Sequence, residues 1–391
     1  MAAITSAESF FIRSPLRVLA SLRLTVVCLA LGMLLVFLGT LAQVHWGIHQ
    51  VQARYFQSVL IYWSPPGASW RIPVLPGGYL LGTVLLINLL AAHATRFQLS
   101  KKKLGIILLH LGVILLLIGQ LLTGLFARET QMRIDEGQTM GYSEAPREVE
   151  LAVIDPTNPD YDQVVAVPEA VLARGGTIQN PTLPFTIKIR QFMANSQLVM
   201  RTQAPDAPPS PATQGFGKNI VATELPRTVK EDERDLSAAF IELEGVQGSL
   251  GTWLVSNAIA DRQPFTVEGH TYSLVMRQRR FYKQFALTLL NFTHDRYAGT
   301  DIPKNFSSRV RLVDFERNEN REVRISMNDP LRYRGYTFYQ SGFDNNDKTS
   351  ILQVVKNPAM LMPYIACGLV ALGLLVQFSM HLFGFVKKRS R

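Results

Sequence analysis

The stretch LGIILLHLGVILLLIGQLLTGL, residues 104–125, contains one ionisable side chain, His110. An apolar run of about 20 residues is long enough to cross a bilayer as a helix. An ionisable side chain is costly in hydrocarbon and therefore usually faces a protein interior or a ligand. Because imidazole is a common ligand of metals and of haem iron, His110 is the first candidate for a functional residue.

Three further runs share this length and character, which predicts four membrane helices in all. The four spans are 22–42, 74–93, 104–125 and 359–384. The first run has a basic flank, as a signal peptide has, but its apolar core is longer than a signal h-region, so we expect it to be retained. Between the third and fourth spans lies a polar stretch, 126–358, which is long enough for a sizeable folded domain.

The formal net charge is +10, and the distribution of the charged residues along the chain is informative. Residues 127–358 carry 27 of the 40 Lys and Arg and 29 of the 30 Asp and Glu, so this region is close to neutral. Most of the other basic residues flank the predicted spans: Arg13, Arg17, Arg23, Arg96, Lys101, Lys102, Lys103, Lys387, Lys388, Arg389 and Arg391. The charge therefore reports membrane topology and gives no reason to expect a nucleic-acid partner.

The positive-inside rule assigns a side to each connection. We expect the N-terminus 1–21, the loop 94–103 and the tail 385–391 to be cytoplasmic. We expect the loop 43–73 and the large domain 126–358 to lie on the outer side. Cys28 and Cys367 both fall within predicted spans and form no CxxC motif, so a thiol-exchange role is not indicated.

The large domain is predicted to be β-rich, because it contains short segments with β-branched and aromatic residues in partial alternation. These segments are 150–155, 185–192, 239–244, 265–276, 286–292, 309–315, 321–327, 336–341 and 351–355. The pair 309–315 and 321–327 is predicted to form a hairpin, and 203–218 a mobile loop. The predicted fold class is thus four transmembrane helices plus a large extracytoplasmic β-rich domain.

Seven histidines compete as ligands, and their positions separate them. His110 lies about 9 Å along the helix from the start of its span, too deep for its side chain to reach the headgroups. On the residues alone, a ligand role and an interhelical hydrogen bond are equally supported. His93 and His381 lie near the ends of spans, where placement at the membrane interface is favoured. His45 and His49 are interpreted as part of an interfacial belt. His270 and His294 are expected to be surface residues.

A six-coordinate haem needs two axial ligands, and His110 supplies one. The second would come from His93, from His381 or from another subunit. Asn88 is expected to bond a neighbouring helix, and Gly112 and Gly119 to permit close helix approach.

The segment RQRRFYK, residues 277–283, is a basic and aromatic cluster in the large domain. It would either meet an anionic group, such as a haem propionate or a lipid headgroup, or form a solvated strand end. The second interpretation is favoured.

Three segments resemble the ResB-type cytochrome c biogenesis family. They are SLRLTVVCLALGMLLVFLGTLAQ at 21–43, LGIILLHLGVILLLIGQLLTG at 104–124 and NDPLRYRGYTFYQSGFD at 328–344. The layout of three spans, a large outer β domain and a final span is similar as well.

The resemblance implies a multi-pass protein of the bacterial inner (cytoplasmic) membrane that acts in system II cytochrome c maturation. It implies a CcsA/ResC-type membrane partner, an apocytochrome c client and a shared haem b, with His110 at the position of the family's intramembrane ligand. The chain would be a subunit of cytochrome c synthase without activity alone. The alternative is a membrane-anchored sensor or scaffold whose β domain binds a partner and whose His110 is structural.

Overall fold

The computed structural model describes residues 16–65, 70–96, 100, 103–229, 233–299, 303–344 and 348–389. Arg13, Lys101, Lys102 and Arg391, used above to assign topology, lie outside the described residues. The chain divides into two compact units, and each is treated by itself. The helical unit comprises Met1–Arg128 and Lys356–Arg391, and the β-rich unit comprises Glu129–Val355.

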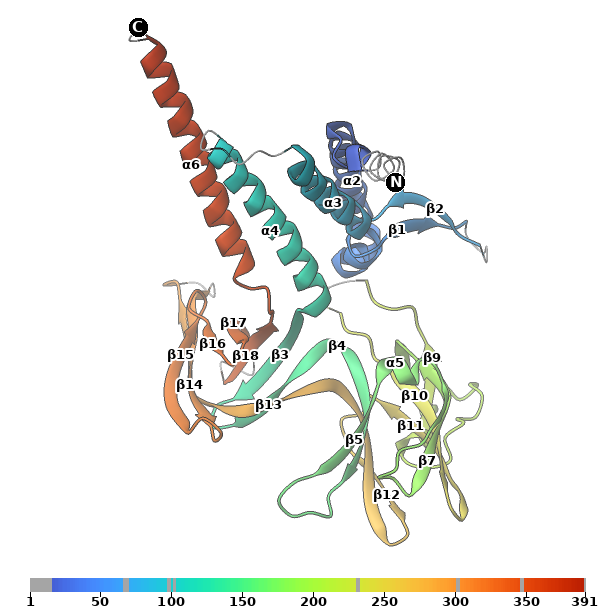
Figure 1. Ribbon diagram of the computed structural model, residues 1–391. Helices are drawn as coiled ribbons and strands as arrows, with labels where there is room; N and C mark the ends of the chain where they lie inside the picture. The colour runs from blue at the N-terminus through green and yellow to red at the C-terminus, as the bar shows by residue number, and fades with distance from the viewer. Residues whose placement is uncertain are drawn as a thin grey trace, which may run out of the picture. The chain divides into compact units, whose positions relative to one another are not determined.

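Among its described residues, the helical unit contains four helices that are long and apolar enough to cross a membrane. They are α2 (Leu22–Val51), α3 (Gly78–Arg96), α4 (Leu104–Phe126) and α6 (Met362–Arg389), labelled in Figure 1. α2 continues beyond the apolar run, through a kink at Gly47, into the short π-helix η1 (Gln52–Phe56). Gly47 has φ 68° and ψ 163°, a conformation that glycine adopts without steric cost. Before α3, β1 (Leu60–Trp63) and β2 (Ile72–Pro76) form an antiparallel hairpin.

Glycines bring α4 and α6 into close contact. A Cβ on Gly112 would lie 2.6 Å from Val370 Cγ2, and one on Gly119 would lie 3.0 Å from the Cβ of Met362. The prediction that these two glycines permit close approach is confirmed, and the neighbour is α6. Gly105, one heptad earlier, also faces α6, at Gln377. A stripe of glycines seven residues apart therefore fixes the rotation of α4 about its own axis.

Asn88 joins α3 to the start of α2, which confirms the predicted interhelical hydrogen bond. Its side-chain oxygen accepts from the Thr25 hydroxyl at 2.7 Å, and its amide nitrogen donates to the carbonyl oxygens of Leu19 and Ser21. Asn88 is 4% exposed. Partners for both ends of the amide explain how so polar a group is buried among apolar helices.

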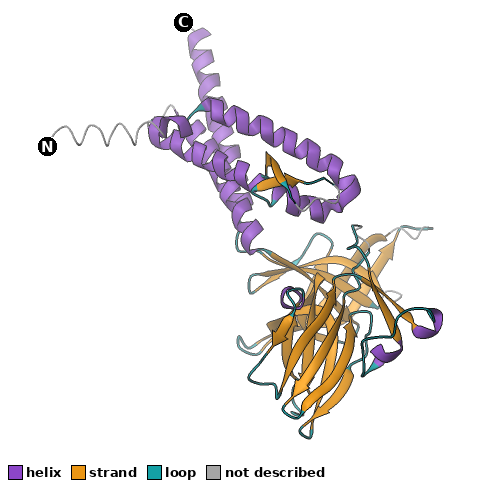
Figure 2. Ribbon diagram, turned by 90° about the vertical axis from the view of Figure 1, so that its right-hand side faces the viewer, coloured by secondary structure: helices purple, strands orange, loops and turns teal. Residues whose placement is uncertain are grey.

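The second unit is β-rich, as predicted, and its strands form two larger sheets (Figure 2). One sheet orders β11 (Gly248–Ser256), β10 (Ala238–Gly245), β7 (Phe185–Met193) and β6 (Gly176–Ile178). The path of the other is β15 (Glu319–Ser326), β14 (Pro303–Asp314), β13 (His270–Arg296), β4 (Thr139–Asp155), β3 (Arg128–Asp135), β18 (Thr349–Lys356), β17 (Tyr336–Asp344) and β16 (Leu331–Tyr333). β12 (Gln263–Val267) pairs with β13, and β5 (Gln163–Pro168) pairs with β4. A two-stranded sheet pairs β8 (Ser196–Met200) with β9 (Ile220–Glu224), and α5 (Glu169–Leu172) is a single short helical turn.

β4 and β13 are the longest strands, and each contributes to two hydrophobic cores. The first core gathers around Leu151, Ile241 and Leu274, and the second around Leu287, Leu312 and Phe338. The predicted hairpin is confirmed by the antiparallel pairing of β14 and β15. The stretch 203–218 is largely irregular, as expected, but part of it packs on β11: Ala212 is buried, and the backbone N–H groups of Thr213 and Gln214 donate to the Thr252 carbonyl.

Candidate functional site

His110 of α4 lies against His93 of α3. The ring centroids are 4.9 Å apart and the ring planes meet at 88°, an edge-to-face contact. His110 faces α3 because the glycines that contact α6 lie roughly opposite to it around α4, at 100° per residue. The structure thus brings together two of the three histidines of the predicted spans.

The hydrogen bond made by His93 indicates how its nitrogens are used. Its Nδ1 lies 2.8 Å from the carbonyl oxygen of Leu89, one turn earlier in α3. A carbonyl can only accept, so Nδ1 carries the proton and Nε2 of the neutral ring carries a lone pair. This is a common arrangement for a histidine that ligates metal through Nε2, because the second hydrogen bond fixes the ring orientation.

The donor set suits one axial position of a haem iron. Two imidazoles lie in contact on neighbouring helices in a largely apolar surrounding, and their nitrogens could ligate iron. The rings touch edge to face, so in this arrangement they do not hold a flat macrocycle between them. One of the two rings could hold a haem iron while the other packs beside it.

The remaining histidines are placed apart from this pair. His381 lies in α6, where its Nε2 is 2.7 Å from Nε2 of Gln377. His45 and His49 are both exposed in α2, and among the described residues no group of three or more His, Cys, Asp or Glu is arranged to hold a metal ion. His270 is exposed, as expected, whereas the ring of His294 packs on Phe343 with centroids 4.3 Å apart.

The helical unit also contains a cavity of about 660 Å³ that the sequence did not reveal. It is lined by residues of α2, η1, α3 and α4, and none of them is charged. Its polar groups are Thr40, Gln43, Gln52, Gln57, Tyr79, Thr83 and Gln120. Polar side chains within apolar helices line a cavity or a pathway more often than they face lipid.

The cavity and the histidine pair share one face of each helix. On α4, Leu117, Leu121 and Gly124 follow His110 at spacings of 7, 11 and 14 residues, which keeps them on one side of the helix. On α3, Leu86, Gly82 and Tyr79 precede His93 at the same spacings. We call this pair of facing stripes the α3–α4 seam. It has two imidazoles toward one end and a cavity lined by uncharged residues toward the other.

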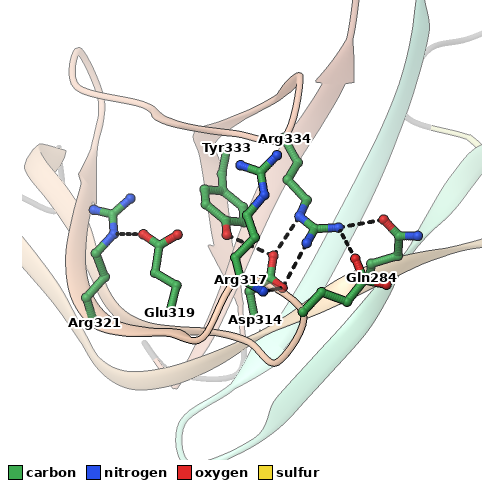
Figure 3. Close-up of polar contacts among 8 residues, drawn as sticks. Gln284, Asp314, Arg317, Glu319, Arg321, Tyr333 and Arg334 are labelled. Atoms are coloured by element: carbon green, nitrogen blue, oxygen red, sulfur yellow. Dashed lines mark hydrogen bonds and ion pairs between the residues drawn. The ribbon is translucent and has the colours of Figure 1, made fainter.

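In the β-rich unit, the segment 328–344 forms a turn that binds a buried carboxylate (Figure 3). Asp314, at the end of β14, is fully buried. It accepts hydrogen bonds from the Tyr333 hydroxyl at 2.8 Å and from Nη2 of Arg334 at 2.9 Å. Arg334 also donates to Glu316 and Gln284. The RYRG part of this segment therefore ties β16 to the end of β14, a structural role.

The backbone at this turn requires unusual conformations. Arg334 has φ 46° and Gly335 has φ 76°, both in the left-handed region. Glycine adopts this region without penalty, but arginine does so at a cost that other contacts must offset. The ion pair between Arg334 and Asp314 is such a contact.

The same contacts shift two pKa values. Burial acts to raise the pKa of Asp314, but hydrogen bonds from Tyr333 and from the backbone of Arg317, with the charge of Arg334, outweigh it and hold that pKa below its usual range. Burial and hydrogen bonds to the carboxylates of Glu319 and Asp314 raise the pKa of Tyr333 to about 12. Asp314 therefore stays charged and Tyr333 stays neutral near pH 7.

Comparison with known proteins supports the resemblance drawn from the sequence. Residues 256–351 match the sequence model of the ResB-like family. Over 91 residues the chain is 37% identical to Protein NrfI of Wolinella succinogenes, which is 23% of this chain and 10% of that protein. The match therefore spans about a tenth of the length of this curated relative. The resemblance to ResB-type proteins is confirmed over this segment of the β-rich unit, which includes β13 to β17.

Proposed function

We propose that this chain acts in cytochrome c biogenesis as a membrane subunit that holds haem b through His110. The contact between His110 and His93 on facing helices is the observation that carries the haem proposal. The match of residues 256–351 to the ResB-like family supports the proposed role in cytochrome c biogenesis.

The chain would span the bacterial inner membrane with α2, α3, α4 and α6. Their length and apolar character support spanning. Basic residues at one end of the spans, such as Arg23, Lys103 and Lys387, favour a cytoplasmic location for that end. The β-rich unit would then lie on the outer side, where it would meet an apocytochrome c.

In this proposal, His110 would hold the haem iron together with a ligand from a CcsA/ResC-type partner. Bound haem would contribute the iron-bearing macrocycle that is attached to the apocytochrome. His93 would orient the imidazole of His110 through ring contact, and its own orientation is set by the hydrogen bond to Leu89. Because the chain offers one axial position, it would be one subunit of the synthase and inactive alone.

The α3–α4 seam suggests a route for outward transfer. The His93–His110 pair lies toward the end we propose to be cytoplasmic, and the cavity begins one heptad further along both helices. Seven residues of helix correspond to roughly 10 Å. Transfer along this seam would keep haem away from solvent while it leaves the first site.

The test is to co-express the chain with its partner, purify the complex and record its absorption spectrum. We expect His110→Ala to remove most b-type haem and to abolish cytochrome c maturation. We expect His93→Ala to retain part of the haem but to alter its spectrum, since it removes an orienting contact. His381→Ala is the matched control, because it removes a histidine from another helix, and it should leave haem content unchanged.

Two outcomes would reject the proposal. Normal haem content and normal maturation with His110→Ala would show that this histidine is not a ligand. A complex that never contains haem, yet binds a protein through its β-rich unit, would favour the alternative of a membrane-anchored sensor or scaffold.

A further inference from the structure

A pocket of about 460 Å³ in the β-rich unit gathers four arginines from three separate segments. Arg234 precedes β10, Arg262 precedes β12, and Arg277 and Arg280 belong to β13. The last two come from the cluster RQRRFYK, which is more than a solvated strand end because it forms one wall of this pocket.

A bulge in β4 lies opposite the part of β13 that lines the pocket. The register against β4 shifts between Gln278 and Arg280, which pair with Val149 and Glu144 respectively. Four residues of β4 thus lie opposite one residue of β13. The extra residues belong to β4, and bulges of this kind are common beside functional sites.

One of the four arginines has no carboxylate partner among the residues that the structure describes. Three arginines are paired with carboxylates: Arg277 with Glu150 at 2.9 Å, Arg280 with Glu144 at 2.9 Å and Arg262 with Asp162 at 3.2 Å. The fourth, Arg234, lies 3.4 Å from the neutral amide oxygen of Gln131 and has no carboxylate partner among the described residues. Arg277 and Arg280 hold their carboxylates through Nε. Nη2 of Arg277 also donates to the Tyr282 hydroxyl at 3.4 Å, whereas the terminal nitrogens of Arg280 make no hydrogen bond among the described residues and can donate to another acceptor.

Apolar side chains complete the wall beside the arginines. Ile154, Leu236 and Val275 line the pocket. A ligand that satisfies both parts of this lining has a singly charged anionic group and an apolar body. The guanidinium fork matches a carboxylate in shape, and one carboxylate would pair with Arg234.

We propose that this pocket binds the carboxylate of an amphipathic organic acid. The same chemistry has two sources: a haem propionate, which would rest on the function proposed above, or a free fatty acid. Binding at this site does not require His110.

The experiment uses the full chain in lipid nanodiscs, titrated with metal-free protoporphyrin IX and followed by porphyrin fluorescence. This probe has propionates but no iron, so histidine ligation does not contribute. The dimethyl ester of the same porphyrin lacks the carboxylates and is the ligand control. We expect the acid to bind about tenfold or more tightly than the ester, since hydrogen bonds to charged groups contribute about 1.5–3 kcal/mol.

Arg234→Gln and Arg280→Gln should each weaken binding of the acid by about tenfold. Arg279→Gln is the matched control, because Arg279 lies in the same strand but pairs with Glu148 at 2.8 Å and does not line the pocket. Arg234 is exposed, so its replacement carries little risk for folding. Circular dichroism of each variant checks that the β-rich unit remains folded.

Equal loss of binding in Arg279→Gln would show general charge attraction and overturn the proposal. Equal binding of the acid and the ester would overturn it as well. Displacement of the porphyrin by oleate would support a fatty acid as the source, whereas resistance to oleate would support a propionate. Unchanged titration in His110→Ala would support this site even if haem ligation by His110 were rejected.

Discussion

Replacement of Gly373 by alanine should push α4 and α6 apart. A Cβ at this position would lie 2.8 Å from the backbone nitrogen of Leu109 and 2.9 Å from the carbonyl oxygen of Gly105. Carbon contacts are normally about 3.5–4.0 Å, so the helices must separate by several tenths of an ångström. Both neighbours are backbone atoms, which cannot rotate away. Overpacking of this kind costs about 1–3 kcal/mol.

Gly368→Ala, in the same helix, provides the matched control. No heavy atom lies within 4 Å of a Cβ built on Gly368. Both substitutions replace a glycine inside α6 by alanine, so the gain in helix propensity of about 1 kcal/mol is common to both. The difference between the two variants therefore isolates the helix contact, at about 1–3 kcal/mol.

The assay is reversible unfolding in mixed detergent micelles, followed by far-ultraviolet circular dichroism. We expect Gly373→Ala to unfold at a lower denaturing-detergent fraction than Gly368→Ala. Gly112→Ala should behave like Gly373→Ala, because its Cβ would lie 2.9 Å from the Ala366 carbonyl oxygen. Equal stability of Gly373→Ala and Gly368→Ala would refute the close packing of α4 and α6.

Three further predictions concern other contacts. Asn88→Leu should lower the free energy of unfolding by about 1–2 kcal/mol in the same assay, since it removes the hydrogen bonds to α2. Asp314→Asn should flatten the pH dependence of the thermal midpoint. Because the pKa of Asp314 is lowered in the folded state, its ionised form stabilises the fold above the pKa of about 3.9 that it has in the unfolded chain. This stabilisation is lost as the pH falls through the pKa of the folded state. An unchanged acid transition in this variant would contradict that assignment. Gly82→Leu, which fills the cavity, should leave haem at His110 but reduce the yield of mature cytochrome c, measured by haem staining.

Local patterns in the sequence predicted part of the secondary structure of each unit. Apolar runs predicted the four long helices. Alternation predicted nine of the sixteen strands from β3 to β18, including the β14–β15 hairpin, but the single predicted segment 265–276 is a hairpin of β12 and β13. β11 was missed because its sequence, GSLGTWLVS, is rich in Gly and Ser and shows little alternation. Its strand conformation comes from pairing with β10, which is a tertiary contact.

The sequence did not predict which side chains contact one another. The position of His110 in an apolar run made it a candidate ligand. The sequence favoured an interfacial position for His93, and its contact with His110 is visible only in the structure. The segment 328–344 resembled the ResB-type family, but the sequence did not show which contact Arg334 makes. The carboxylate that Arg334 binds lies twenty residues earlier in the chain. Separation along the sequence gives no signal for such pairs.

The sequence by itself determined the number of apolar helices and the β-rich character of 126–358, and it made His110 the first candidate ligand, because hydropathy and alternation are properties of neighbouring residues. Only the tertiary structure decided that His93 contacts His110 and that four arginines converge on one pocket. The first depends on the rotation of α4, which the glycine contacts with α6 fix, and the second on the meeting of three separate chain segments at the pocket. Both features arise from packing between distant segments, which local propensity does not encode.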